Sequence, residues 1–161
     1  NSIDGSALLS GGVMSGDYYW YIYDGSSTGD LTIGSDVDLG SRKVILIASN
    51  SGINFAGNVS LTDGIGFFLA VSSGDINLNA ATDSFEGIYV ADDTFRTGSG
   101  ATQLNLRGSV AAYGGIELER DLGEGPNLTT AAEVFEYAPD QEMLFPSVFA
   151  AHATKWQEIA P

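Results

Sequence analysis

The sequence predicts an all-β fold, and within that class a parallel β-helix (β-solenoid) of about 20–23 residues per coil with a Gly-free C-terminal capping tail. Short runs rich in Val, Ile, Leu, Phe and Tyr recur between Gly, Asn, Asp and Ser, the residues that turns prefer. No segment before Gly125 keeps a 3.6-residue apolar period, so no long helix is expected there. A strand, a polar corner and a second strand also repeat along the chain, as successive coils require.

The repeat is clearest between LIASNSGINF (46–55) and LAVSSGDINL (69–78), which align at an offset of 23 residues with Leu46 over Leu69. An antiparallel β-sandwich, the competing fold, also has many short strands, but it does not predict an internal repeat. The same alignment pairs Ser49 with Ser72, Ile53 with Ile76, Asn54 with Asn77 and Phe55 with Leu78. Later turns of the pattern follow in 88–97 and 109–119.

Two residue types in the repeats suit a solenoid. Ala48, Ala70 and Ala91 are small enough for tight inward positions. Asn at a corner tolerates a left-handed backbone and can hydrogen-bond to stacked copies of itself. We therefore expect Asn54 and Asn77 to form a ladder between neighbouring coils.

The first strong strand, GDYYWYIYDG (16–25), has two aromatic faces, because side chains alternate along a strand. It is either a wall of the core or a platform on which sugar rings stack. We expect Trp20 and Ile22 to face the core, and the tyrosines on the other face to cover a flank or pack on an upstream coil. These tyrosines are also the surface best suited to a glycan ligand: Tyr19, Tyr21 and Tyr23.

Composition changes abruptly after Gly125. All 21 glycines lie between Gly5 and Gly125, and all four prolines lie at or after Pro126. An open solenoid exposes its ends and needs caps. We therefore divide the chain into a β-solenoid, 1–125, and a capping tail, 126–161, packed on the solenoid in the same structural domain.

Within the tail, Thr130 and Glu133 have the spacing of a helix capping box. This pattern predicts about two helical turns that stop before Pro139. Trp156 is expected to anchor the end of the tail, which wraps back over the last coils. His152, the one histidine, is expected to be a packing or surface residue, so a nucleophilic triad is not predicted.

The charge balance limits the partners. Asp and Glu number 21 against 6 Lys and Arg, for a net charge of −15, so the chain repels nucleic acids and anionic membranes. It has no Cys, which excludes disulfides and thiolate metal sites. No apolar run approaches the roughly 20 residues that span a bilayer. Because the sequence starts at Asn1 without a signal-like segment, we expect any signal or anchor to lie upstream.

Paired aspartates are the candidate metal ligands. Asp36 and Asp38 share one strand face, and Asp92 and Asp93 precede Arg96. Such pairs offer hard oxygen ligands to calcium, and clustered carboxylates also cleave polysaccharides in some β-helix enzymes. A solvated acidic face is the simpler interpretation, so we predict no required cofactor, with calcium as the candidate ion.

Two arginines of the C-terminal half have a structural interpretation. Arg107 and Arg120 are two of only six basic residues and lie among many carboxylates. We expect each to form a local salt bridge to a neighbouring acidic side chain.

The C-terminal part resembles a known motif series. It is similar to the C-terminal end of large uncharacterised cell-surface proteins of candidate-phyla (Patescibacteria-type) bacteria, some of which are described as pilus-assembly proteins of the PilX kind. The resemblance covers 102–161 well and 1–101 loosely. The matching residues are Gly108–Ser109, Arg120–Gly123, Ala132–Asp140, Leu144–Pro146, Trp156, Glu158, Ala160 and Pro161.

This resemblance implies an extracellular β-helix at the end of an anchored chain, and it implies no reaction. The repeats also loosely resemble those of bactofilin-type polymers, which would imply self-assembly. The function expected is therefore a non-enzymatic structural or adhesive cell-surface module that contacts a host cell, a glycan or other copies of itself. The alternatives are a carbohydrate-binding or carbohydrate-cleaving β-helix protein that uses the Asp pairs, and a pilus-associated or self-polymerising filament subunit.

Overall fold

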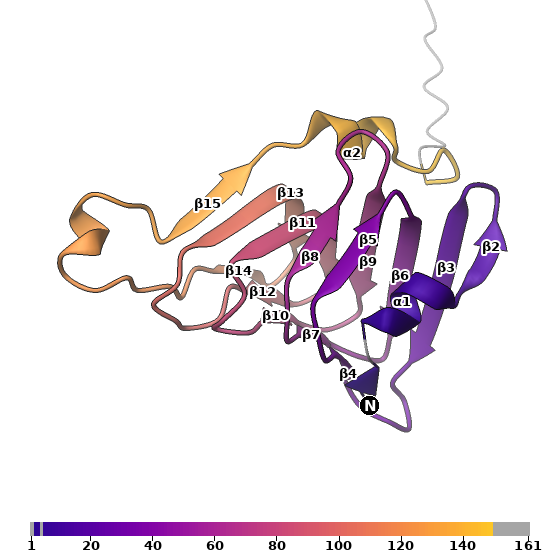
Figure 1. Cartoon of the computed structure of the whole chain (residues 1–161). Coiled ribbons are helices and arrows are strands. Elements are labelled where there is room, and N and C mark those ends of the chain that lie inside the picture. Colours follow the sequence, from indigo (N-terminus) through magenta and orange to yellow (C-terminus); the bar gives the residue numbers. More distant parts are fainter. Residues whose placement is uncertain (1, 4, 150–161) are drawn as a thin grey trace, which may run out of the picture.

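The structure, a computed structural model, describes residues 2–3 and 5–149 of the chain. It confirms a parallel β-solenoid, in which each short strand lies beside its equivalent in the next coil (Figure 1). The described helices are short: α1 (Ser6–Ser10), α2 (Pro139–Met143) and a 3-10 turn, Pro126–Leu128. The strands are β1 (Ser2–Ile3), β2 (Val13–Ser15), β3 (Tyr18–Asp24), β4 (Leu31–Ile33), β5 (Val37–Gly40), β6 (Lys43–Ser49), β7 (Ile53–Phe55), β8 (Val59–Leu61), β9 (Phe67–Ser72), β10 (Ile76–Leu78), β11 (Ser84–Ala91), β12 (Thr94–Arg96), β13 (Leu104–Ala112), β14 (Gly115–Glu117) and β15 (Glu133–Glu136).

Each coil has three faces. Sheet A stacks β1, β4, β7, β10, β12 and β14 in that order, and sheet B stacks β2, β3, β6, β9, β11, β13 and β15. The third face is short: β5 pairs with β8, and Val59 of β8 pairs with Phe85 at the start of β11. The described strand pairs are parallel, except that β2 folds back antiparallel on β3.

The strand register confirms half of the predicted repeat. In sheet A, Ile53 pairs with Ile76 at the predicted offset. In sheet B the predicted alignment is wrong by one residue, because Leu46 pairs with Ala70 and Ile45 pairs with Leu69. A one-residue shift exchanges the two faces of a strand. Leu46 belongs to the main core, whereas Leu69 packs in a smaller cluster on the outer face.

Side chains from the three faces fill the interior. The predicted tight positions are confirmed, since Ala48, Ala70 and Ala91 are at most 1% exposed and belong to the main core. Ala70 lies in register with the buried Tyr89, so a small side chain stands beside a large one, as close packing requires. One inward column is at most 1% exposed in four successive coils: Leu31, Ile53, Ile76 and Phe95.

The predicted asparagine ladder forms, but it does not lie at a corner. The Asn77 side-chain amide donates to Asn54 Oδ1 over 3.0 Å, and both residues are the middle residues of their strands in sheet A. A corner residue with a left-handed backbone is Asn50, at φ 51°.

The corner between the third face and sheet B changes along the solenoid. In an early coil, residues 62–66 separate β8 from β9, whereas β11 and β13 run through this corner without interruption. They bend at Gly87 and Gly108, which pair in register with φ of 134° and 147°. A Cβ atom on Gly108 would lie 1.8 Å from the Gly87 carbonyl oxygen, so only glycine fits there.

The two ends of the solenoid differ. At the N-terminal end, called here the closed end, α1 covers the first coil and places the fully buried Leu8 in the main core. At the C-terminal end, called here the open end, β14 and β15 are the last described strands of sheets A and B. Their inward residues, Ile116 and Phe135, are 47% and 43% exposed.

The predicted orientation of β3 is wrong. Tyr19, Tyr21 and Tyr23 pack against the main core, and Ile22 is 76% exposed. Trp20 faces outward with the smaller cluster on sheet B. Parallel pairing with β6 aligns the tyrosine face with the inward residues of that strand. Strand alternation distinguishes two faces without saying which one is inward.

The described part of the tail packs on the solenoid, but its predicted helix is wrong. Glu133–Glu136 forms strand β15, which pairs in parallel with Leu104–Arg107 of β13. The apolar Val134 and Phe135 favour a strand once a neighbouring edge is available. The helix follows instead of preceding Pro139, which occupies the first turn of α2, where a missing N–H costs nothing.

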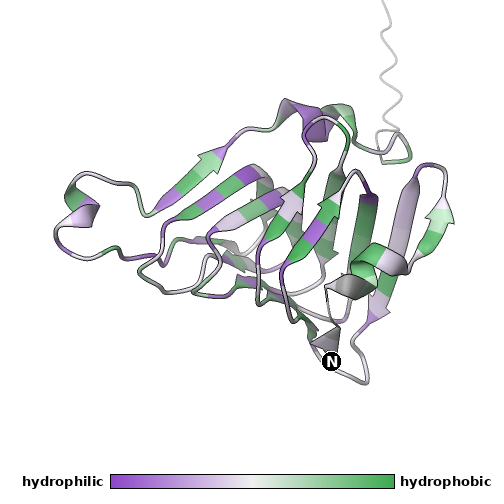
Figure 2. Ribbon diagram, in the orientation of Figure 1, coloured by the Kyte–Doolittle hydropathy of each residue, from purple (hydrophilic) through white to green (hydrophobic). Residues whose placement is uncertain are grey.

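After β15 the tail turns back along the outside of sheet B (Figure 1). Figure 2 shows a hydrophilic α2 followed by more hydrophobic residues. The Phe145 ring lies 6.2 Å from that of Phe67, and the Phe149 ring lies 5.7 Å from that of Trp20. The tail therefore covers the outer apolar face of the early coils and leaves the open end uncovered by these residues.

Candidate functional site

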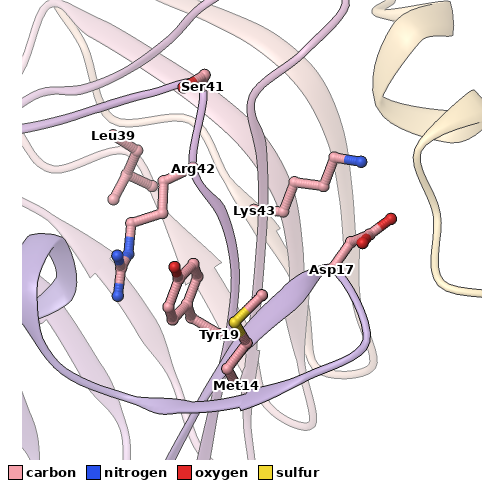
Figure 3. A pocket seen from close by; sticks show the side chains of 7 residues that line it. All are labelled: Met14, Asp17, Tyr19, Leu39, Ser41, Arg42 and Lys43. Carbon is pink, nitrogen blue, oxygen red and sulfur yellow. The ribbon is translucent and has the colours of Figure 1, made fainter.

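A hollow of about 380 Å³ lies at the closed end, between the β2–β3 hairpin and the turn from β5 to β6. Figure 3 shows the side chains that surround it. They combine two cations, one carboxylate, one aromatic ring and apolar groups: Met14, Asp17, Tyr19, Leu39, Ser41, Arg42 and Lys43.

Arg42 is the best-positioned side chain of the hollow. Its guanidinium carbon lies 3.4 Å from the centre of the Tyr19 ring, which is cation–π contact. One terminal nitrogen, Nη2, donates to the Gly11 carbonyl over 2.5 Å and to the Tyr21 hydroxyl over 3.4 Å. The Nε atom is buried and has no hydrogen-bond partner among the described residues. Arg42 is thus fixed in place and keeps an unused donor.

Lys43 and Asp17 complete the charged wall of the hollow. The ammonium nitrogen of Lys43 lies 5.6 Å from the centre of the Tyr18 ring. In Figure 3, Asp17 comes from the β2–β3 hairpin, Arg42 from the turn between β5 and β6, and Lys43 from the start of β6. Two of the six basic residues of the chain therefore line the hollow, each against a different tyrosine ring, and their positive charge can attract an anionic group.

The three tyrosines predicted as a glycan surface separate in the structure. Tyr19 lines the hollow. Tyr21 donates its hydroxyl to the Ala7 carbonyl over 2.9 Å, and the Tyr23 hydroxyl donates to the Gly29 carbonyl over 2.9 Å. Two of the three hydroxyl groups thus stabilise the closed end, and the glycan role of the set stays a prediction.

The four predicted calcium ligands lie in two separate places, and Asp38 is a residue of strand β5 itself. Asp36 Oδ1 accepts the Asn58 N–H over 2.8 Å, and Asp38 Oδ1 accepts the Gly40 N–H over 3.1 Å. Asp92 and Asp93 are exposed at the corner between β11 and β12. Within residues 2–3 and 5–149, no three acidic or histidine side chains gather as a metal site would require.

Arg96 forms ion pairs with carboxylates other than those of Asp92 and Asp93. Its guanidinium donates to Asp75 over 2.5 Å and to Glu117 over 2.8 Å. Partial burial acts to raise the pKa of Asp75, but the Thr94 N–H and the Arg96 guanidinium lower it more. Arg96 therefore joins three neighbouring coils and does not face Asp92 or Asp93 as a catalytic partner would.

The two structural arginines have different partners. Arg107 forms the predicted salt bridge, at 2.7 Å from Asp140 of α2. The prediction for Arg120 is wrong. Its buried guanidinium donates to main-chain carbonyls, at 2.6 Å from Thr97 and 2.9 Å from Asn79, with a further bond to Ala80. Burial lowers the pKa of Arg120, although three carboxylates nearby oppose this.

Two residues of the hollow were missed by the sequence analysis. Arg42 and Lys43 are adjacent, and they are a third of all basic residues in an acidic chain, which was the available signal. The predicted tail residues His152, Trp156, Glu158, Ala160 and Pro161 lie outside the described residues.

Comparison with family models, curated proteins and solved structures gave no match for this chain. The resemblance to candidate-phyla surface proteins thus stays a prediction. Among the described residues, no helix has both the length and the apolar character needed to cross a membrane.

Proposed function

We propose that this chain is a non-enzymatic structural and adhesive module displayed outside a cell. The observation that carries the proposal is the continuous stack of coils around a filled interior. The corner backbone is also engaged: the Ser51 N–H bonds to Ser73 Oγ, and the Gly52 N–H bonds to Asp30 Oδ1. Backbone groups that pair between neighbouring coils give a stiff body that resists local opening and proteolysis.

A carbohydrate-cleaving enzyme receives less support. Glycoside hydrolysis uses two carboxyl groups about 5–10 Å apart on either side of the bond. Asp36, just before β5, and Asp38, within β5, each accept a backbone N–H, and Asp92 and Asp93 lie at the corner between β11 and β12. In this proposal, Asp36 and Asp38 thus stabilise the backbone around β5.

A self-polymerising filament subunit would need two complementary ends. At the closed end, α1 and Leu8 occupy the place of a further coil. Head-to-tail stacking would therefore require α1 to leave its position, so we rank this function below adhesion.

The adhesive function is tested with beads that carry the full chain through an N-terminal tag. Under flow, we expect more of these beads to stay on cultured animal cells or on immobilised glycans than beads that carry albumin. Beads carrying the heat-denatured chain control for charge. Equal retention of all three kinds of bead would contradict the adhesive function.

Carbohydrate binding is a second candidate function, favoured by the hollow at the closed end. A Tyr ring can stack on a sugar, and Arg42 and Lys43 can pair with a sugar carboxylate. The substrate class is thus an acidic glycan built from uronic acids.

Calorimetric titration with oligogalacturonate tests this site. Lys43→Gln should weaken binding about threefold by removing one charge contact, and Asp17→Asn should strengthen it by a similar factor. A neutral galactan should not bind. Equal affinities for the wild type and both variants would exclude the hollow as the site.

A further inference from the structure

The open end of the solenoid is incomplete, because the last coil leaves inward apolar residues uncovered. Ile116 occupies the column of Phe95 in the coil before, and Phe135 occupies that of Leu106. Phe95 is 0% exposed and Leu106 1%, against 47% and 43% for the two residues of the last coil. The positions therefore have the orientation of core residues without a coil to cover them.

The backbone at this end is also free to pair. β15 bonds to β13 on one side, and no strand among residues 2–3 and 5–149 lies on its other side. The chain between β14 and β15 extends past the last coil in Figure 1. An uncovered edge strand is a template for a further strand.

The charges at the open end indicate what that strand would be. Acidic side chains gather there, and the nearby Arg96, Arg107 and Arg120 already have partners within the chain. The acidic residues of this end are Glu117, Glu119, Asp121, Glu124, Glu133 and Glu136.

Strand β15 itself has the sequence Glu-Val-Phe-Glu. Glu133 points along the inward column with Phe135, while Val134 and Glu136 point along the outer one. Glu133 accepts the Thr97 hydroxyl over 3.0 Å and the Arg120 N–H over 2.8 Å, both through Oε1. No described residue donates to its Oε2.

We propose that β15 accepts an extended cationic segment of another polypeptide, in which two apolar residues stand between two Lys or Arg residues. Side chains directly opposite each other on paired strands attract when their charges differ and repel when they are alike. The basic residues would lie against Glu133 and Glu136, and the apolar ones against Val134 and Phe135. Because this pattern is the same in both directions, parallel and antiparallel pairing satisfy it equally.

A second copy of the chain is the less favourable occupant. Two β15 edges would place glutamate against glutamate in either direction. Each copy also carries a net charge of −15. The inference rests on the proposed function in one respect: it names how an adhesive module would hold a protein partner.

The probe is the blocked peptide acetyl-Gly-Lys-Val-Ile-Lys-Gly-amide, titrated into the ¹⁵N-labelled full chain. Amide shifts should concentrate at 133–136, and the affinity should fall as salt screens the charges. A peptide with Glu in place of both Lys should bind at least about tenfold more weakly, since two attractions become repulsions. N-methylation of the Val and Ile should abolish binding, because it removes backbone donors.

A charge exchange gives the matched variants. Glu136 is exposed, and Glu136→Lys should lower the affinity for the Lys peptide about fivefold and raise the affinity for the Glu peptide. Glu124→Lys makes the same charge change outside the strand and should leave both affinities within a factor of about two.

Four results would overturn the inference. Two concern the peptides: equal binding of the Lys and Glu peptides, or binding of the N-methylated Lys peptide as tight as that of the unmethylated one. The other two are a concentration-dependent dimer that shifts the same amides, and peptide binding only after removal of 150–161. The last two would identify a second copy or the chain's own C-terminal segment as the occupant. Loss of bead retention with peptide binding intact would contradict the adhesive function alone.

Discussion

The two ends of the solenoid are terminated by different physical means. At the closed end, α1 places Leu8, at 0% exposure, over the first coil, and the Tyr21 hydroxyl binds its backbone. At the open end, Ile116 stays half exposed, and polar contacts hold the last coil: Arg120 binds carbonyls of the earlier corners, and Arg107 binds α2.

This difference shows that a solenoid end can be stabilised without being covered. At the closed end, α1 covers the apolar interior with Leu8, so another coil cannot stack there unless α1 moves. Directed polar contacts at the open end leave that surface available. The stability of a solenoid end and the availability of its surface for binding are thus separate properties. Substitutions at the two ends should show this difference.

The largest effect is expected from the glycine bend of the last coils. Gly108→Val should destabilise the chain by about 4 kcal/mol or more, because its Cβ would overlap the Gly87 carbonyl. Gly123→Ala is the control, since Gly123 also has a positive φ but no described atom within 4 Å of its Cβ position, and should cost about 1 kcal/mol. Urea denaturation measures both. Similar losses would show that the close approach at the bend carries little energy.

Arg120→Met should cost about 3 kcal/mol, because carbonyl groups of two earlier corners lose a charged donor. Hydrogen exchange should increase first around residues 97–103, at the corner that Arg120 binds. Arg96→Met, which removes more exposed ion pairs, is the comparison and should cost less. Equal effects would mean that the polar contacts of the open end are no stronger than surface ion pairs.

Matched truncations compare the ends directly. Leu8→Ala should cost about 3 kcal/mol by leaving a cavity in the core. Ile116→Ala should cost about 1 kcal/mol, since half of that side chain already contacts water. Thermal unfolding measures the pair, and equal costs would indicate that the open end is covered in solution.

Acid should loosen the tail with the smallest effect, about 1 kcal/mol. Partial burial acts to raise the pKa of Asp140, but the Gly64 N–H and Arg107 lower it more, so the folded pKa lies below the unfolded one. The contribution is therefore complete above the ordinary carboxyl pKa of about 3.9 and is lost as pH falls through the folded value. Exchange of the Gly64 amide reports it, and Asp140→Asn should remove the acid dependence.

The candidate site was only partly visible in the sequence. The sequence predicts Tyr19 as part of an aromatic ligand surface, and Tyr19 does line the hollow. The sequence does not predict the role of Arg42, because its contact with Tyr19 depends on the register of β3 and β6. The calcium prediction rests on the close spacing of the aspartates in each pair, which says nothing about the partners that each carboxylate meets in the fold.

The sequence by itself determined the features that repeat with the coil. The offset between Ile53 and Ile76, the small Ala70 and the Asn54–Asn77 ladder all follow from residues that meet their own equivalents. Stacking makes such contacts local to one repeat, so a linear pattern is enough to predict them.

The tertiary structure alone decided the features that meet different partners. Which face of β3 is inward depends on its pairing with β6, and the strand at Glu133–Glu136 forms because an edge of β13 is available. The carbonyl groups that Arg120 binds lie 23 to 41 residues away. Such contacts outweigh the local helix propensity of a residue, which is worth roughly a few tenths of a kcal/mol. Leaving a buried polar group or a strand edge without a partner costs more than that.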